Sequence, residues 1–304
     1  MLIDIISPSG SHLDLPGFDK ACERLQSLGY ALHVRAPREP WQRFGGNDEA
    51  RLAMIHDAAK GPANVVMLTR GGYGLSRLLD RIDWSLIASA VARGQKWMGY
   101  SDFTTFQCAL LAKTGAHSFT GPTVTSDFSP DELDVLTLMS FQAGLRGAVP
   151  LVQWDMPLQT PLAAVDSLTR HPVRGLLWGG NATMIANLVG TPYLPQLAKP
   201  GILWLEEVGD HPYRVERLLH QLFFAGILQK QVALLFGSVT QWKPAPHDNG
   251  YNWEAVLHYW RERLPQLLML DGLPFGHQPT KTVLEFGRPY RLSVSGQSLS
   301  LLPD

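Results

Sequence analysis

The first half of the chain alternates short apolar runs with amphipathic segments, and this alternation constrains the fold more than any other feature. The apolar runs predict strands over residues 2–7, 30–34, 64–69 and 96–100. Helices are predicted between them, over residues 17–28 and after Asn47, which is a good N-cap residue. Nearly all-apolar strands separated by helices are typical of a mostly parallel sheet that is covered on both faces. The functional loops of such sheets gather at the carboxyl ends of the strands.

The second half follows a looser pattern that is richer in β-structure. Between about residues 149 and 174 four prolines interrupt the chain, and we interpret this stretch as the crossover between two domains. Strands are predicted over 175–178, 201–205 and 232–236, and β-hairpins over 282–286 and 291–302. We therefore expect an N-terminal α/β domain over residues 1–158 and a C-terminal mixed α+β domain over residues 159–304.

Composition argues against several classes of function. The chain has 304 residues and a formal net charge of −1, which disfavours nucleic acid or an anionic membrane as the main partner. No apolar segment reaches the ~18 residues of a membrane span, and residues 1–8 lack the basic start of a signal peptide. We therefore expect a soluble, cytoplasmic protein. Cys22 and Cys108 are the two cysteines and have no metal-ligand spacing, so a disulfide framework or a zinc ribbon is not expected.

A serine stands where an apolar run meets a predicted helix. The stretch Gly99-Tyr100-Ser101-Asp102-Phe103-Thr104 places Ser101 just before a helix-like segment over 102–113. A serine hydroxyl needs a positioned base, and donors for the developing oxyanion, before it acts as a nucleophile. A tight strand-to-helix turn exposes the side chain and leaves the N–H of Asp102 unpaired at a helix N-terminus. Because Asp102 and Phe103 replace the x-G of the usual G-x-S-x-G elbow, the motif alone only suggests a nucleophile.

Two glycine-rich segments follow predicted strands. The segment Arg70-Gly71-Gly72-Tyr73-Gly74 does not fit G-x-G-x-x-G, because Leu75-Ser76-Arg77 follows it. It does not fit a Walker A motif either, because the lysine is absent. The segment is either a plain turn or a set of backbone N–H groups aimed at a carboxylate or oxyanion, with Arg70 adding positive charge. Gly179-Gly180-Asn181 is predicted to be a tight turn in which Asn181 caps a helix. Substrate contact through its glycine backbone is the alternative.

The candidates for a general base and its partner lie in the second half. Glu206 and Glu207 follow the apolar run 202–205, so a carboxylate is presented where a predicted strand ends. A solvated pair at a loop edge is the common alternative. Strand alternation sends the two carboxylates to opposite faces, so at most one of them enters a shared cleft. His277, one of ten histidines, lies in a loop beside Gly276.

Taken together, these segments resemble the LD-carboxypeptidases, a family of serine peptidases. The matching segments run in the family's order across nearly the whole chain: Ser7-Pro8-Ser9-Gly10, Arg70-Gly71-Gly72-Tyr73-Gly74, Gly99-Tyr100-Ser101-Asp102-Phe103-Thr104, Trp178-Gly179-Gly180-Asn181, Leu205-Glu206-Glu207, His211-Pro212-Tyr213-Arg214-Val215-Glu216-Arg217 and Phe275-Gly276-His277. Two positions depart from the family pattern. Tyr100 stands where a histidine often precedes the serine, and Glu207 stands where the family usually has aspartate.

The resemblance implies a Ser–His–Glu triad. In this triad Ser101 is the nucleophile, His277 is the general base and acid, and Glu206 holds the imidazole. The resemblance also implies a flavodoxin-like N-terminal domain, a C-terminal domain rich in β-structure, an active site between the two domains and a homodimer. No cofactor or metal is implied.

The reaction that the resemblance implies is removal of a C-terminal D-alanine from a murein tetrapeptide (a cytoplasmic muropeptide) during peptidoglycan recycling. The bond cut joins the L-centre of a diamino acid to the D-residue. The N–H groups of Gly72 and Asp102 are our candidates for the oxyanion hole. The candidates for substrate binding are Arg70, which suits the free carboxylate of an exopeptidase substrate, and Gly71, Gly180 and Asn181.

Three alternatives stay open. A relative within the family hydrolyses peptidyl or aminoacyl nucleotides and confers immunity to microcins, with the same triad and different nucleotide-holding loops. A non-catalytic muropeptide-binding protein would not require all three triad residues. A metal-dependent peptidase fits poorly, because His211 and His220 lie nine residues apart and do not form H-E-x-x-H.

Overall fold

Two β-sheets organise the chain in the computed structural model, which describes residues 1–304 except 13, 149–150, 158–165 and 167. The residues form two units. Unit 1 contains Met1–Val149, Thr191–Pro195 and Val283–Gly287, and unit 2 contains Pro150–Gly190, Gln196–Thr282 and Arg288–Asp304. The domain boundary predicted between residues 158 and 159 lies outside the described residues.

The sheet of unit 1 has the strand order β11-β5-β4-β3-β1-β2. All neighbouring strands are parallel except β11, which pairs antiparallel with β5. The bounds are β1 Leu2–Ile6, β2 Ala31–Val34, β3 Val65–Leu68, β4 Lys96–Gly99, β5 Ser118–Thr120 and β11 Leu284–Phe286. The predicted parallel sheet is therefore confirmed. The predicted hairpin over 282–286 is wrong, because this segment adds an edge strand to the first sheet.

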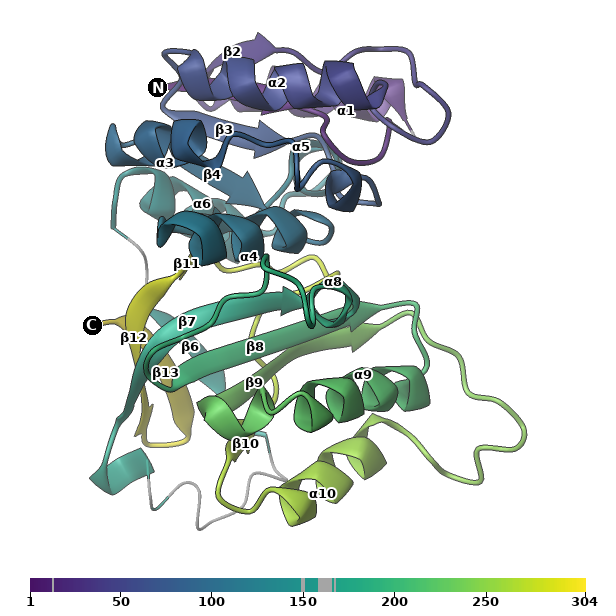
Figure 1. The fold of residues 1–304 in the computed structure, drawn as a ribbon, viewed down its shortest axis with the longest axis vertical. Coiled ribbons are helices and arrows are strands. Elements are labelled where there is room, and N and C mark those ends of the chain that lie inside the picture. Colours follow the sequence, from purple (N-terminus) through teal and green to yellow (C-terminus); the bar gives the residue numbers. More distant parts are fainter. Residues whose placement is uncertain (13, 149–150, 158–165, 167) are drawn as a thin grey trace. The chain divides into compact units, whose positions relative to one another are not determined.

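Helices cover both faces of this sheet (Figure 1). One apolar core lies under α2, α3 and α4 and includes Ile55, Ile87 and Phe106. The other core lies under α1, α5 and α6 and includes Phe18 and Phe141. The helices are α1 Leu15–Ser27, α2 Asp48–Lys60, α3 Trp84–Ala92, α4 Phe103–Thr114, α5 Val124–Phe128 and α6 Val135–Leu145, with a 3-10 turn, η1, at Leu75–Arg77. Asn47 caps α2 as predicted, because its side chain accepts a hydrogen bond from Ala50 N.

The sheet of unit 2 has the strand order β10-β9-β8-β7-β12-β13-β6. Its first four strands are parallel, and its last three pair antiparallel, which gives the mixed α+β architecture expected of the second half. The bounds are β6 Val152–Asp155, β7 Val173–Asn181, β8 Gly201–Val208, β9 Gln231–Thr240, β10 Leu268–Leu270, β12 Arg288–Ser295 and β13 Ser298–Pro303. Strands β12 and β13 form the predicted C-terminal hairpin.

The described helices of unit 2 include two amphipathic ones, α9 and α10, which lie side by side next to β9 (Figure 1). Their bounds are α8 Ala182–Asn187, α9 Pro212–Phe224, η2 Leu228–Lys230 and α10 Trp253–Arg263. Val215, Leu219 and Leu222 form the buried stripe of α9, and Gly226 follows its end with a φ of +72°. No helix in the described part of the chain is long and apolar enough to cross a membrane.

Two strands of unit 2 run further than the sequence indicates. Strand β7 continues through Gly179 and Gly180 to Asn181, where a tight turn is predicted. The extension depends on glycine, since a Cβ at Gly179 would lie 1.9 Å from the Trp204 carbonyl oxygen of β8. Strand β8 continues to Val208, so Glu206 lies inside the strand and not at its end, and the β8–β9 register shifts between Leu205 and Glu207.

Candidate active site

Ser101 occupies a strained turn between β4 and α4. Its backbone φ is +64°, a left-handed conformation that is uncommon for a residue with a side chain. Such conformations persist where the surrounding structure enforces them, and they cluster at functional positions. Asp102 follows with helical dihedrals, and Thr104 N donates to Ser101 O at 2.9 Å. This geometry is that of a strand–turn–helix nucleophile elbow.

The glycine-rich loop after β3 lies directly against Ser101. A Cβ at Gly71 would lie 2.5 Å from Ser101 Cβ, 2.6 Å from Ser101 Oγ and 3.4 Å from Asp102 N. Glycine is therefore the residue that leaves space for the hydroxyl. Gly72 has a φ of +108°, which also favours glycine. Within the described part of the chain, neither the Gly72 N–H nor the Asp102 N–H donates a hydrogen bond, so two backbone donors in the turns around Ser101 are unused.

Arg70 brings a cation to the same end of this sheet. Its Nη1 donates to the Ser11 carbonyl oxygen at 3.3 Å, and a Cβ at Gly10 would lie 2.5 Å from this nitrogen. The side chain is half-buried, and this burial lowers the pKa of the guanidinium from its ordinary value. Among the described residues no carboxylate lies within ion-pair distance of Arg70. A half-buried guanidinium without a carboxylate partner is suited to an anionic ligand.

In unit 2, Glu206 and His277 are in close side-chain contact, although they lie 71 positions apart in the chain. His277 Nδ1 lies 2.7 Å from Glu206 Oε2, and the glutamate is 1% exposed whereas the histidine side chain is 19% exposed. A carboxylate bound to Nδ1 fixes the orientation and tautomer of the imidazole and stabilises its protonated form. The alternative of a solvated Glu206 at a loop edge is therefore wrong.

The loop that carries His277 is held against β9 by backbone pairing. Leu273 N donates to Phe236 O at 3.0 Å, Ser238 N donates to Phe275 O at 2.9 Å, and Thr240 Oγ1 donates to His277 O at 3.1 Å. Gly276 has a φ of +131°, and a Cβ there would lie 2.2 Å from Ser238 Oγ and 3.2 Å from Glu206 Cβ. The glycine beside His277 thus permits the close approach of its loop to Glu206.

Glu207 has different partners from Glu206, as strand alternation predicts. Its Oε1 accepts from Asn181 Nδ2 at 2.9 Å and from its neighbour Val208 N at 3.0 Å. Its Oε2 accepts from Thr183 N at 2.9 Å and from Thr183 Oγ1 at 2.8 Å. Burial raises the pKa of this carboxyl. Asn181 also caps α8, as predicted, by accepting from Met184 N. Glu207 therefore stabilises the start of α8, and Glu206 is the carboxylate that meets the histidine.

The histidines considered for a metal site have other partners. His211 caps α9 and pairs with Asp248, with 3.0 Å between Nε2 and Oδ2, and His220 lies 3.8 Å from Glu216. Across the residues that the structure describes, no three histidine, cysteine, aspartate or glutamate side chains gather as they would around a metal ion.

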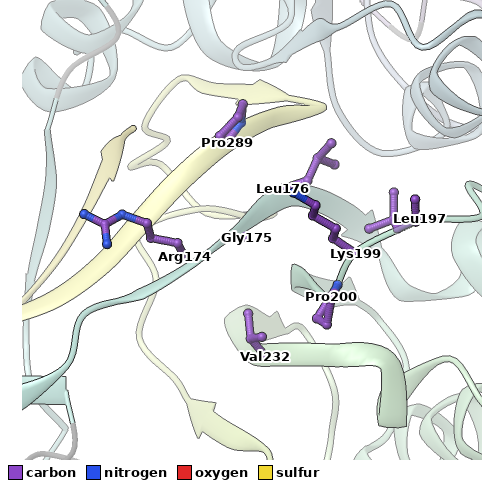
Figure 2. A pocket seen from close by; sticks show the side chains of 9 residues that line it. Arg174, Gly175, Leu176, Leu197, Lys199, Pro200, Val232 and Pro289 are labelled. Carbon is purple, nitrogen blue, oxygen red and sulfur yellow. The ribbon is translucent and has the colours of Figure 1, made fainter.

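A cavity of 610 Å³ opens in unit 2 at the amino ends of β7, β8 and β9 (Figure 2). Its lining is mostly apolar and consists of Arg174, Gly175, Leu176, Leu197, Ala198, Lys199, Pro200, Val232 and Pro289. Arg174 pairs with Asp304, with 2.9 Å between Nε and Oδ2. Glu206 lies toward the opposite end of β8, so this cavity is separate from the Glu206–His277 pair.

Comparison with known proteins identifies the family. The N-terminal domain of the LD-carboxypeptidases matches residues 3–121, and their C-terminal domain matches residues 174–292. The chain belongs to the LD-carboxypeptidase family. The predicted family is thus confirmed, and so are the predicted enzyme class, a serine carboxypeptidase, and the predicted pair of an α/β domain and a β-rich α+β domain.

Three LD-carboxypeptidase relatives show how far the similarity extends. The crystal structure of muramoyltetrapeptide carboxypeptidase from Oxalobacter formigenes has a TM-score of 0.89 and 37% identity, over 100% of this chain and 99% of that one. Murein tetrapeptide carboxypeptidase of Pseudomonas aeruginosa is 30% identical over 78% of this chain and 76% of that protein. The microcin C7 self-immunity protein MccF of Escherichia coli is 24% identical over 78% of this chain and 73% of that protein.

The side chains that surround the candidate residues of this LD-carboxypeptidase were not predicted from its sequence. Ser238 lies beside Gly276 of the loop that carries His277, on a strand that was predicted to end at residue 236. The Asp102 side chain, considered only for its backbone N–H, accepts hydrogen bonds from two other loops. In the G-x-S-x-G pattern Asp102 stands at the variable position and Phe103 replaces the glycine, so the motif gave no signal for the Asp102 side chain.

Proposed function

We propose that this chain is a muramoyltetrapeptide carboxypeptidase that removes the terminal D-alanine from murein tetrapeptides by a Ser101–His277–Glu206 mechanism. The observation that carries the proposal is the 2.7 Å contact between His277 Nδ1 and Glu206 Oε2. It occurs in a family of serine carboxypeptidases, and Ser101 in the other unit has the left-handed turn of an activated nucleophile.

In the proposed first step, His277 takes the proton of the Ser101 hydroxyl as Oγ attacks the carbonyl carbon of the peptide bond before D-alanine. Glu206 stabilises the resulting imidazolium. The negative charge that develops on the carbonyl oxygen needs preorganised donors, and the unused N–H groups of Gly72 and Asp102 are suited to supply them. The C–N bond then breaks, and His277 gives the proton to the amine of the departing D-alanine.

In the second step, water attacks the acyl-enzyme while His277 removes one of its protons. Collapse of this second tetrahedral intermediate returns the proton to Ser101 Oγ and releases the shortened peptide as a carboxylate. The triad takes its nucleophile from unit 1 and its base pair from unit 2, so the proposed mechanism requires both units.

Arg70 is proposed to bind the free carboxylate of the terminal D-alanine. An exopeptidase must recognise this group, and a guanidinium binds it by charge-assisted hydrogen bonds. Arg70 supports the proposal because it is half-buried and has no carboxylate within ion-pair distance among the described residues. Gly71, Gly180 and Asn181 are the further substrate-binding residues that we propose.

The test is D-alanine release from a diaminopimelate-containing murein tetrapeptide by wild type and Ser101→Ala. Release that collapses in Ser101→Ala is expected. Equal release by both proteins would contradict the triad. Release of the amino acid from an aminoacyl sulfamoyl adenosine without release of D-alanine would instead favour the microcin-immunity reaction, a function carried in the name of the relative MccF.

The setting of the activity is part of the proposal. We propose that the enzyme acts in the cytoplasm during peptidoglycan recycling, as a homodimer and without a nucleic-acid partner. Light scattering on the purified protein gives the oligomeric state, and a mass that corresponds to one chain would exclude the dimer. Accumulation of tetrapeptide muropeptides in a deletion strain is expected if the enzyme works in recycling.

A further inference from the structure

The side chain of Asp102 joins three loops at the carboxyl ends of neighbouring strands. It is 1% exposed, and its Oδ2 accepts from Ser9 Oγ at 2.7 Å and from Leu75 N at 3.0 Å. Ser9 follows β1, Leu75 follows β3, and Asp102 itself follows β4. One carboxyl oxygen therefore links the turn that contains Ser101 to the two loops beside it.

Arg51, a buried cation on α2, binds the same two loops. Its Nη1 donates to the carbonyl oxygens of Pro8 and Gly74, the residues directly before Ser9 and Leu75. The guanidinium is fully buried, and its Nη2 pairs with Asp48 at 2.6 Å. A Cβ at Gly74 would lie 2.6 Å from Arg51 Nη1, so the loop is packed closely onto this group. In each loop, the Arg51 guanidinium thus binds one residue and the Asp102 carboxyl group binds the next.

The loop after β3 matters to the proposed reaction because it contains Gly71 and Gly72. Gly71 packs against Ser101, and Gly72 supplies one of the two unused N–H groups. Shifts of about 1 Å at a reacting centre cost roughly 10²-fold in rate. A group that holds this loop in register with Ser101 therefore controls catalysis without touching substrate.

We propose that the Asp102 side chain is a positioning residue, which holds the loops at Ser9 and Leu75 in register with Ser101 so that the nucleophile and its oxyanion donors stay aligned. The inference rests on the proposed function for its catalytic readout. The other carboxyl oxygen, Oδ1, is buried and accepts no hydrogen bond from the described residues. A half-satisfied buried carboxyl is costly for folding alone, which favours a role in the site.

Burial agrees with this arrangement. It raises the pKa of Asp102 to about 6, although the two hydrogen bonds and the charge of Arg51 act in the opposite direction. The desolvation cost thus exceeds the stabilisation that its partners give to the carboxylate. An asparagine fits the same space, retains one acceptor oxygen and avoids the buried charge, whereas alanine removes the acceptor.

The first arm of the experiment measures kcat and KM for D-alanine release in Asp102→Asn, Asp102→Ala and Ser9→Ala. We expect Asp102→Ala to lose roughly 10²-fold in kcat with KM changed less than about threefold, because the lost alignment affects the transition state. Asp102→Asn is expected to recover about tenfold of that loss. The double variant with Ser9→Ala is expected to be no slower than Asp102→Ala alone, because both changes break one link.

The matched control is Asp83→Ala. Asp83 is also an aspartate of unit 1 that accepts a backbone N–H, that of Leu86, and it lies at the start of α3, which precedes β4. This variant is expected to lose stability and to keep wild-type kcat while folded. If Asp102→Ala kept kcat within twofold of wild type, or lost activity only in proportion to its unfolded fraction, the positioning role would be overturned.

The second arm separates this inference from the proposed function. Hydrogen exchange of peptides that cover residues 7–10 and 70–75 reports loop alignment without any substrate. Faster exchange of both segments in Asp102→Ala, and unchanged exchange in Asp83→Ala, is the expected result. Unchanged exchange in Asp102→Ala would refute the inference even in an active enzyme. A wild type that releases no D-alanine would refute the proposed function, and the exchange arm would still decide the role of Asp102.

Discussion

The two units hold their candidate residues in different ways. In unit 1 the surroundings of Ser101 are mostly main chain: a left-handed serine, the glycine Gly71 that leaves room for its hydroxyl, and two N–H groups that donate to none of the described residues. In unit 2 the candidate residues are side chains, a buried glutamate and a partly exposed histidine joined at 2.7 Å. Ser101 is thus held by backbone shape, and His277 by its contact with a buried carboxyl group.

This difference determines which substitutions each half tolerates. The surroundings of Ser101 are expected to be disrupted when a side chain is added, because there is no space for a Cβ next to Ser101. The contact between Glu206 and His277 is expected to be disrupted when either side chain is removed, because the remaining partner loses its hydrogen bond in a largely buried place. The predictions below test this contrast, from the largest expected effect to the smallest.

Removal of a reacting group gives the largest effect. Ser101→Ala and His277→Ala are each expected to lower turnover by about 10⁶-fold, and the double variant is expected to be no slower, because the groups act as one unit. Single-turnover assays of D-alanine release measure this. Additive losses in the double variant would mean that the two units do not contribute to one triad.

The two adjacent glutamates give the next contrast. Glu206→Gln is expected to lower kcat by about 10⁴-fold, because the imidazolium loses its counter-charge and the tautomer is no longer fixed. Glu207→Gln is expected to keep turnover within about threefold and to lose about 1–3 kcal/mol of stability, since donors at the start of α8 lose a carboxylate acceptor. Kinetics and denaturation of both variants test the assignment, and the reverse pattern would exchange their roles.

Addition of one methyl group tests the backbone half. Gly71→Ala is expected to lower kcat by roughly 10²-fold, because the new Cβ would overlap Ser101 Cβ and displace the nucleophile. Gly94→Ala is the control, since Gly94 has a φ of +94° and an open surrounding. It is expected to cost about 1 kcal/mol of stability and no activity. Equal kcat in the two variants would contradict the packing argument.

The last prediction concerns stability and not turnover, through its pH dependence. Burial raises the pKa of Asp102 from 3.8 to about 6, so the folded state holds a proton that the unfolded state releases. The stability that the folded state gains from holding this proton is fully present below about pH 4, and it is lost as the pH rises through 6. The stability of wild type relative to Asp102→Asn is therefore expected to fall by up to about 3 kcal/mol between pH 4 and pH 7. Urea denaturation at several pH values measures it, and a constant difference would contradict the shift.

Much of the fold follows from local pattern. Apolar runs flanked by helix caps predicted β1, β3 and β4 to within one or two residues, because buried parallel strands must be apolar along their whole length. The strand–helix alternation also predicted that Ser101 and the Arg70–Gly74 loop lie at the carboxyl ends of parallel strands, and the structure shows that these two strands are neighbours. The order of the loop motifs along the chain led to the family, because each motif is a short continuous segment that can be recognised without the structure.

Pairing between distant segments was harder to predict. Strand β11 has the apolar pattern of a hairpin strand, yet it joins the sheet of unit 1, and only its partner β5 reveals this. Glu206 was expected at a strand end, because nothing in the local sequence shows that β7 pairs with β8 as far as Glu206 and that β9 pairs with it as far as Val208. Such extensions depend on glycines such as Gly179, which permit contacts that local propensity does not encode.

By itself the sequence determined the type of each domain and the family, because these depend on periodicity and on motifs that are continuous in the chain. The serine, histidine and glutamate of the proposed triad stay a prediction that the family resemblance implies. Tertiary structure decided that Glu206 and not Glu207 meets His277. It also decided that the Asp102 side chain binds Ser9 and Leu75. These contacts join residues that lie 26 to 93 positions apart in the chain, and the adjacent Glu206 and Glu207 point to opposite faces of their strand. Both features exist only once the strands have paired.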